Sequence, residues 1–131
     1  MIIGLLSCSK EKLSGAHSAA ELYSSPFFQN NVNKLIETCD KVYVISGKFG
    51  LIELEFVMNN YDLYLGSLNH NDKLIWGNLV IKELLNKNNI TKEDKIVVVA
   101  SNDYYDYVAY GAEYYNIESF IVHENYYDFA K

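Results

Sequence analysis

The chain has 131 residues, half of them apolar, so it can form one domain with its own core and is too apolar to be disordered. Its formal net charge is −6, and all eleven basic residues are lysine. Because arginine makes the typical bidentate contacts to phosphate and guanine, this charge argues against duplex nucleic acid as a partner but leaves small phosphate ligands open.

The first third of the chain predicts one strand and two helices. The continuous apolar run at residues 2–6 is typical of a central strand covered on both faces. A loop rich in Ser, Gly and Lys follows at 7–15, and then a helical segment at 18–24. A second helix is predicted over 26–39, because Pro26 follows a serine cap and the apolar residues recur with helical spacing.

The middle of the chain predicts a strand, an irregular segment and a long helix. Residues 41–45 read Lys-Val-Tyr-Val-Ile and predict the second strand, which ends in Ser-Gly-Lys-Phe-Gly at 46–50. Residues 51–67 have no clear period and predict irregular structure. Leucine and isoleucine then recur with helical spacing over 71–86.

The last third predicts two more strands around a helix. Residues 95–100 are apolar and predict the third strand, and a helix capped within 101–103 runs to about residue 115. Residues 117–122 predict the last strand, after which a tyrosine-rich segment closes the chain. This segment and the exposed edges of a sheet would suit a homodimer.

Strands that alternate with helices favour a parallel sheet. The sequence therefore predicts a single α/β domain over residues 1–131, Rossmann-like and three-layered, with a mostly parallel sheet of about four strands and helices on both faces. No basic segment precedes the first apolar run, and no run is long enough to span a bilayer. Cys8 and Cys39 have neither metal nor disulfide spacing. We expect a cytoplasmic protein with no membrane association, metal or cofactor.

Polar segments follow the predicted strands at 7–10, 46–50, 101–103 and 123–124. Ligands of open α/β sheets bind in the crevice beyond the carboxyl ends of the strands. Since three of the four segments begin with serine, these segments predict one shared ligand site.

The first of these segments, Ser7-Cys8-Ser9-Lys10, has the groups needed to hold an anion: backbone amides, two hydroxyls and the Lys10 ammonium. It is neither a P-loop nor a dinucleotide fingerprint. Cys8 is a candidate nucleophile, and the alternative is a packing residue that points away from the crevice. For Lys10 the alternative is a solvated surface lysine.

The other segments supply further candidates. Ser101 begins the segment after the third strand and Tyr104 follows closely, in a helix whose tyrosines serve either the core or a wall for stacking a base. His123 and Glu124 are a candidate acid/base pair, or a surface pair. The three histidines have no ligand-like spacing, so a metal site is not expected.

Four motifs in order resemble the YaaA peroxide-stress family, most closely the short bacterial and phage proteins related to it. They are Leu-Leu-Ser-Cys-Ser-Lys, Ala-Ala-Glu-Leu-Tyr, Tyr-Val-Ile-Ser-Gly-Lys-Phe-Gly and Asn-Tyr-Asp-Leu-Tyr-Leu. The resemblance extends from residue 2 to about 65, with a weaker correspondence at Trp76 and Tyr104. A similar Cys-Ser-Lys domain in archaeosine synthase favours nucleobase or nucleoside ligands.

The resemblance and the strand ends together imply a set of site residues. Lys10, Glu21 and Asp62 are the catalytic candidates. The ligand-binding candidates are Ser7, Cys8, Ser9, Tyr23, Ser46, Gly47, Lys48, Gly50, Tyr61, Ser101 and Tyr104.

These candidates lead to three functional hypotheses. The first is an enzyme that acts on a small nucleotide, nucleoside or nucleobase derivative, by N-glycosidic cleavage or base/sugar transfer, in which a carboxylate stabilises a cationic sugar. The second is a module that binds such a ligand without turnover, in a phage or defence context. The third, DNA binding as in YaaA proteins, is disfavoured by the acidic charge.

Overall fold

The structure is a computed structural model that describes residues 1–63 and 65–124. The tyrosine-rich segment that favoured a homodimer lies outside the described residues from residue 125 onward. Within the described ranges, no helix combines the length and the apolar character needed to cross a bilayer.

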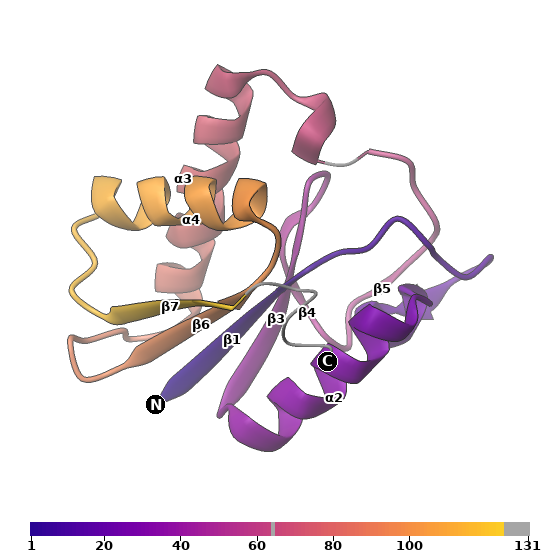
Figure 1. Cartoon of the computed structure of the whole chain (residues 1–131), viewed down its shortest axis with the longest axis horizontal. Coiled ribbons are helices and arrows are strands. Elements are labelled where there is room, and N and C mark those ends of the chain that lie inside the picture. Colours follow the sequence, from indigo (N-terminus) through magenta and orange to yellow (C-terminus); the bar gives the residue numbers. More distant parts are fainter. Residues whose placement is uncertain (64, 125–131) are drawn as a thin grey trace.

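Five strands form the main sheet, in the order β4-β3-β1-β6-β7 (Figure 1). The strands are β1 (Ile2–Ser7), β3 (Lys41–Ser46), β4 (Gly50–Glu53), β6 (Lys95–Val99) and β7 (Phe120–Glu124). All neighbours pair in parallel except β3 and β4, which are antiparallel. The mixed α/β class and the mostly parallel sheet are confirmed, but the sheet has one strand more than expected.

The additional strand, β4, arises from a tight turn. Residues 47–49 reverse the chain, and Gly50 pairs with Ser46 at a φ of 72°, a left-handed conformation that glycine adopts without a steric penalty. The short run at 51–53 then doubles back along β3. Without the turn geometry, this run was too short to predict a strand.

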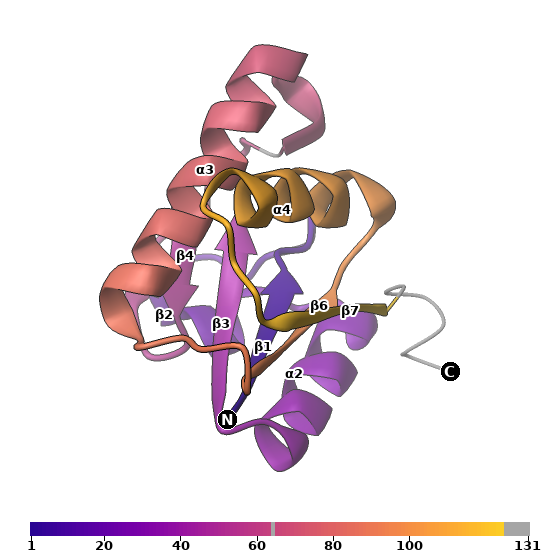
Figure 2. The ribbon, with the colours of Figure 1, turned by 90° about the vertical axis from the view of Figure 1, so that its left-hand side faces the viewer.

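Helices cover both faces of the sheet (Figures 1 and 2). On one face lie α1 (Ala19–Leu22) and α2 (Pro26–Thr38), and on the other lie α3 (His70–Lys87) and α4 (Asn102–Tyr114). Residues of β1 alternate between the two cores, since Ile3 and Leu5 pack with α3 and α4 whereas Leu6 packs with α2. This alternation explains the continuous apolar run of the first strand.

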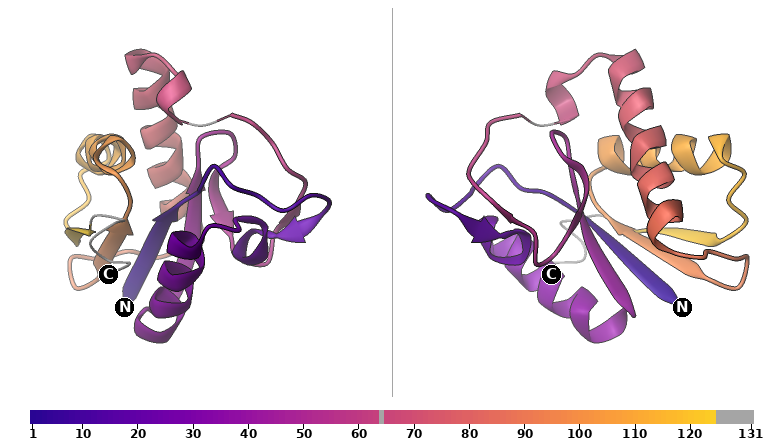
Figure 3. Two further views of the ribbon diagram at one scale, coloured as in Figure 1. Left: turned by 45° about the vertical axis from the view of Figure 1, so that its right-hand side comes forward. Right: turned by 180° about the vertical axis from the view of Figure 1, so that it is seen from behind.

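The segments predicted to be irregular contain small elements. β2 (His17–Ser18) pairs antiparallel with β5 (Val57–Met58), so that two segments distant in sequence lie side by side (Figure 3). A short 3₁₀ helix, η1 (Leu65–Ser67), precedes α3. The expected helix at 18–24 is shorter than predicted and comprises only α1.

The chain leaves β1 and β6 toward opposite faces of the sheet. The connection from β1 passes through α1 and α2 to β3, while the connection from β6 passes through α4 to β7. Because β1 and β6 are neighbours, their carboxyl ends border a gap between the two connections. This gap is where side chains can reach a ligand without being covered by a crossing segment.

Helices α3 and α4 are in backbone contact at two glycines. A Cβ atom at Gly77 would overlap the carbonyl oxygen of Tyr107, and one at Gly111 would overlap the carbonyl oxygen of Gly77. Both glycines therefore set the distance between the helices that cover one face of the sheet.

We expect Gly77→Ala to lower the free energy of unfolding by at least about 2 kcal/mol, because a methyl group there forces two helix backbones apart. Urea denaturation measures this loss. Lys82→Ala, at an exposed position of the same helix, is the control and should change stability by less than about 0.5 kcal/mol. Equal stability of the two variants would contradict the close helix contact.

Candidate functional site

A pocket of about 350 Å³ lies at the carboxyl ends of β1 and β6. It is lined by Ser7, Cys8, Ser9, Lys10, Glu11, Ser25, Phe27, Ser101 and Tyr104. Six of these nine residues are predicted site residues: the four of the first loop, together with Ser101 and Tyr104. The structure thus brings two of the predicted segments into one pocket.

Hydrogen bonds hold the loop after β1. The amide of Cys8 donates to the carbonyl of Ile45 at 3.0 Å, which extends the parallel pairing of β1 with β3 by one residue. The hydroxyl of Ser9 donates to the carbonyl of Glu11 at 3.2 Å. Lys10 is exposed, and its ammonium has no partner among the described residues, so it is available to a ligand.

The N-termini of α2 and α4 both reach the pocket. The α2 terminus is capped, because Ser25 Oγ accepts from the amide of Phe28 at 3.1 Å. Ser101 occupies the cap position of α4 but makes no side-chain cap hydrogen bond. The first-turn amides of α4 therefore lack this side-chain partner beside a pocket, an arrangement that favours an anion.

Cys8 lines the pocket and also packs against the core cluster on the α2 side of the sheet. Its sulfur is 3.4 Å from the hydroxyl of Tyr104, and that hydroxyl also accepts from the amide of Leu65 at 3.4 Å. The Tyr104 ring stands edge-on to Trp76, with 5.5 Å between centroids. The tyrosine is thus fixed between the pocket and the core.

A buried hydrogen-bond network centred on Ser46 lies next to this wall. Ser46 Oγ accepts from the amides of Lys48 and Phe49, both at 3.2 Å, and is 2.8 Å from the hydroxyl of Tyr61. The Tyr61 hydroxyl is in turn hydrogen-bonded to that of Tyr23. We refer to Ser46, Tyr61 and Tyr23 as the hydroxyl network.

Burial raises the pKa of Tyr23, Tyr61 and Tyr104, and the proximity of Cys8, when charged, raises all three further. The three hydroxyls are therefore neutral at physiological pH. The ammonium of Lys12 lies over the Tyr61 ring, 4.6 Å from its centroid, in a cation–π contact.

The remaining predicted residues are placed elsewhere. Gly47, Lys48 and Gly50 form the turn between β3 and β4, beside the hydroxyl network but outside the pocket wall. Glu21 on α1 and Asp62 are exposed, and neither lines the pocket. The two carboxylates expected to act in catalysis thus do not line this pocket.

Three residues of the pocket wall are not among the predicted site residues: Glu11, Ser25 and Phe27. Glu11 directly follows the predicted loop, so extending the loop by one residue would have included it. Ser25 was recognised only as a helix cap. Nothing in the sequence indicates that Phe27, in the first turn of α2, lies near the end of β1.

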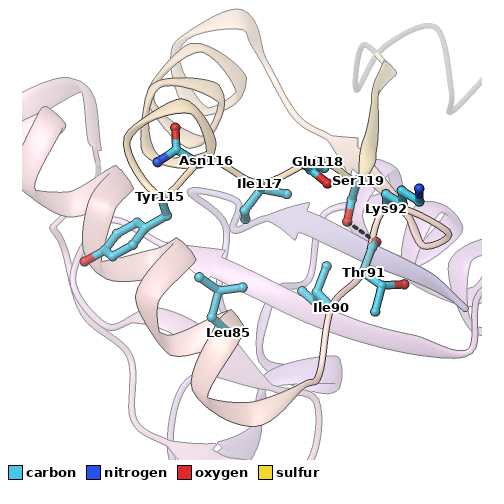
Figure 4. A pocket seen from close by; sticks show the side chains of 9 residues that line it. All are labelled: Leu85, Ile90, Thr91, Lys92, Tyr115, Asn116, Ile117, Glu118 and Ser119. Carbon is cyan, nitrogen blue, oxygen red and sulfur yellow. Dashed lines mark hydrogen bonds between the residues drawn. The ribbon is translucent and has the colours of Figure 1, made fainter.

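A second pocket, of about 220 Å³, lies at the opposite end of the strands, near the amino-terminal ends of β6 and β7 and between the C-terminal ends of α3 and α4 (Figure 4). The hydroxyl of Ser119 donates to the carbonyl of Thr91 at 2.7 Å across it. Asn116 adopts a φ of 53° and Ile117 donates back to Ala112, which closes the end of α4. The Ser119–Thr91 hydrogen bond joins the connection that leads into β6 to the one that leads into β7. We therefore assign this pocket a structural role.

Two further expectations concern histidine and metal. His123 stacks on Tyr105 with 4.2 Å between centroids, and its Nε2 is 2.9 Å from the carbonyl oxygen of Ala100, so it supports the end of β6. Among the residues that the structure describes, no group of three His, Cys, Asp or Glu side chains is placed to hold a metal ion.

The fold and the pocket define a mixed α/β domain with a polar site at the carboxyl edge of its sheet. A family model described as a family of unknown function, DUF6884, matches residues 3–122, so the chain belongs to this family. The expected membership of the YaaA-like family is wrong, because the model that matches almost the whole chain is that of a different family. No curated protein and no solved structure matches the chain.

Because of the hydroxyl network, we expect the free energy of unfolding to depend on pH in the alkaline range. The pKa values of Tyr23 and Tyr61 are raised in the folded protein, so their contribution is complete below the ordinary tyrosine value of about 10 and is lost as the pH rises above it. We expect the free energy of unfolding to fall as the pH rises above about 10, and to fall less steeply in Tyr61→Phe.

Urea denaturation at each pH measures this slope. Tyr110→Phe, at an exposed position of α4, is the matched control and should retain the wild-type slope. Identical slopes in Tyr61→Phe and the wild type would show that Tyr61 is not protected from ionisation.

Proposed function

We propose that this domain binds a small phosphate-bearing ligand of the nucleotide or nucleoside class in the pocket at the ends of β1 and β6. The observation that carries the proposal is the position of this pocket between two neighbouring parallel strands whose connections leave toward opposite faces. Doubly wound sheets bind ligands at this point. The same arrangement supports a Rossmann-like, three-layered class.

The chemistry of the wall favours an anion. Lys10 supplies a mobile positive charge, serine hydroxyls supply donors, and the uncapped N-terminus of α4 supplies backbone amides. The net charge of −6 belongs to the whole chain, whereas Glu11 is the one carboxylate that the described residues contribute to the pocket wall. A small anion can therefore bind here although a polyanion is repelled overall.

The size and the aromatic content of the pocket fit a nucleotide. A volume of about 350 Å³ is at the lower end of the range of small-molecule sites, which begins at about 300 Å³. Phe27 and Tyr104 contribute aromatic rings to the wall, and Phe27 keeps 43% of its surface exposed. Such rings suit a planar base next to a bound phosphate.

Cleavage of an N-glycosidic bond in this pocket is our second candidate. It needs a carboxylate beside the sugar, and Glu11 occupies the pocket wall, whereas Glu21 and Asp62 do not. Binding without turnover would instead make the domain a sequestering or sensing module. We also propose that the protein is cytoplasmic and forms a homodimer.

Isothermal titration calorimetry with inorganic phosphate, AMP, ADP and GMP tests the binding. We expect saturable binding of at least one nucleotide and a loss of about tenfold or more in Lys10→Ala, because a charge-assisted contact to phosphate contributes about 1.5–3 kcal/mol. Lys92→Ala, in the wall of the second pocket, is the matched control and should bind as the wild type does.

The same mixtures are then analysed by chromatography for free base. A base released by the wild type and not by Glu11→Gln would support cleavage, whereas a recovered intact nucleotide would support a binding module. Equal effects of Lys10→Ala and Lys92→Ala, or no binding of any of the four ligands, would contradict the proposed site.

A further inference from the structure

Two lysines bring their ammonium groups to one aromatic ring beside the proposed pocket. The ammonium of Lys12 lies 4.6 Å from the centroid of the Tyr61 ring, and that of Lys48 lies 5.9 Å from the same centroid. The two lysines come from different segments, because Lys12 follows the loop after β1 and Lys48 lies in the turn after β3. We refer to Lys12 and Lys48 as the lysine pair.

The lysine pair has no carboxylate as a counterion. The chain has 17 acidic and 11 basic residues, so carboxylates are in excess. In the part of the chain that the structure describes, Lys73 and Lys87 each form an ion pair, whereas neither member of the lysine pair does. Two like charges near one ring repel each other, and an anion bound between them removes this repulsion.

The aromatic rings under the lysine pair do not supply the missing negative charge. Burial raises the pKa of Tyr61 and that of Tyr23, so both hydroxyls keep their protons at physiological pH. A neutral ring attracts a cation through its electron-rich face but leaves the positive charge uncompensated. The lysine pair therefore depends on an anion from solution for its counterion.

Lys12 is held in position by the segments around it. Its backbone pairs with that of Tyr23 in an isolated antiparallel bridge, and its ammonium donates to the carbonyl of Lys10 at 3.2 Å. The residue is half-buried, although an ammonium has three donors and only one of them is used in this hydrogen bond. A donor that is already positioned loses less side-chain entropy when an anion binds.

The lysine pair adjoins the proposed pocket. Lys10 lines that pocket, and its carbonyl is the acceptor for the Lys12 ammonium. Cys8 lines the pocket too, and its amide donates to the carbonyl of Ile45 in β3, three residues before Lys48. Because β1 lies between β3 and β6, its carboxyl end has the pocket on the β6 side and the lysine pair on the β3 side.

We propose that the lysine pair is a second anion subsite, which binds the second phosphoryl group of a ligand whose first phosphoryl group lies at Lys10. The inference rests on the proposed function for the first group and narrows the ligand class to nucleotides with linked phosphoryl groups, such as a nucleoside diphosphate. The pocket alone has a volume of about 350 Å³, near the lower end for small-molecule sites, so a diphosphate that extends along the loop of Lys10 and Lys12 uses space outside it.

Isothermal titration calorimetry with inorganic phosphate and with pyrophosphate, in buffer free of divalent cations, separates the two subsites. We expect the wild type to bind pyrophosphate about tenfold or more tightly than phosphate, since only pyrophosphate reaches both subsites. Lys12→Met and Lys48→Met should each weaken pyrophosphate binding about tenfold and change phosphate binding less than about twofold. Methionine retains an apolar side chain over the ring and removes the charged donor.

Two further lysine variants serve as references. Lys10→Ala should weaken the binding of both anions, because it removes the contact to the first phosphoryl group. Lys82→Ala removes one positive charge at an exposed position of α3 and should bind both anions as the wild type does, which separates a local contact from an effect of net charge. If Lys12→Met does not fold, Lys48→Met, at an exposed position of the turn, retains the same expected result.

The outcomes distinguish the second subsite from the proposed pocket. Equal affinities of the wild type for phosphate and pyrophosphate, or pyrophosphate binding unchanged in Lys12→Met and Lys48→Met, would overturn the inference. A loss of phosphate binding in Lys10→Ala would still support the pocket in that case. Conversely, weaker pyrophosphate binding in both methionine variants with no effect of Lys10→Ala would support an anion site at the lysine pair and contradict the proposed pocket.

Discussion

Ser46 lies at the point where β3 ends, and the arrangement around the pocket depends on its hydrogen bonds. Its hydroxyl binds two amides of the following turn and the hydroxyl of Tyr61, and its carbonyl accepts from the indole of Trp76 at 2.8 Å. These bonds join α3, the turn and the segment after β5 to one strand end. An apolar residue at this position would remove the three contacts of the hydroxyl, and each buried polar group left without a partner costs about 1–3 kcal/mol.

As a consequence, side chains of the core hold the inner wall of the pocket in place. Cys8 continues β1 next to the end of β3, and its sulfur is 3.4 Å from the hydroxyl of Tyr104, whose ring packs edge-on against Trp76. The outer wall consists of a flexible lysine, serines and two helix ends. A well-packed inner side and a polar outer side suit a ligand that is recognised by its charge.

Much of the fold was predictable, because apolar runs and helical spacing reflect burial directly. The strands predicted at 2–6, 41–45 and 95–100 and the three long helices agree with the structure. By contrast, β4 depends on the turn that ends at Gly50. The contact of Gly77 with α4 depends on tertiary packing. Of the site, the loop at 7–10 was found from its place after a strand. Tyr23 and Tyr61 follow no strand, and their burial cannot be deduced from sequence. The resemblance to YaaA proteins rested partly on Ser46 and Tyr61, residues that this fold needs for its own stability.

The most direct test of the proposed site is a titration of the ¹⁵N-labelled protein with ADP, monitored through its backbone amide resonances. We expect saturable shifts at the amides of Ser9 and Lys10, which line the pocket, and at those of Asn102 and Asp103 in the first turn of α4. Amides around the second pocket, such as those of Lys92 and Glu118, should remain unchanged. Shifts confined to the second pocket, or no saturable shift at any amide, would contradict it.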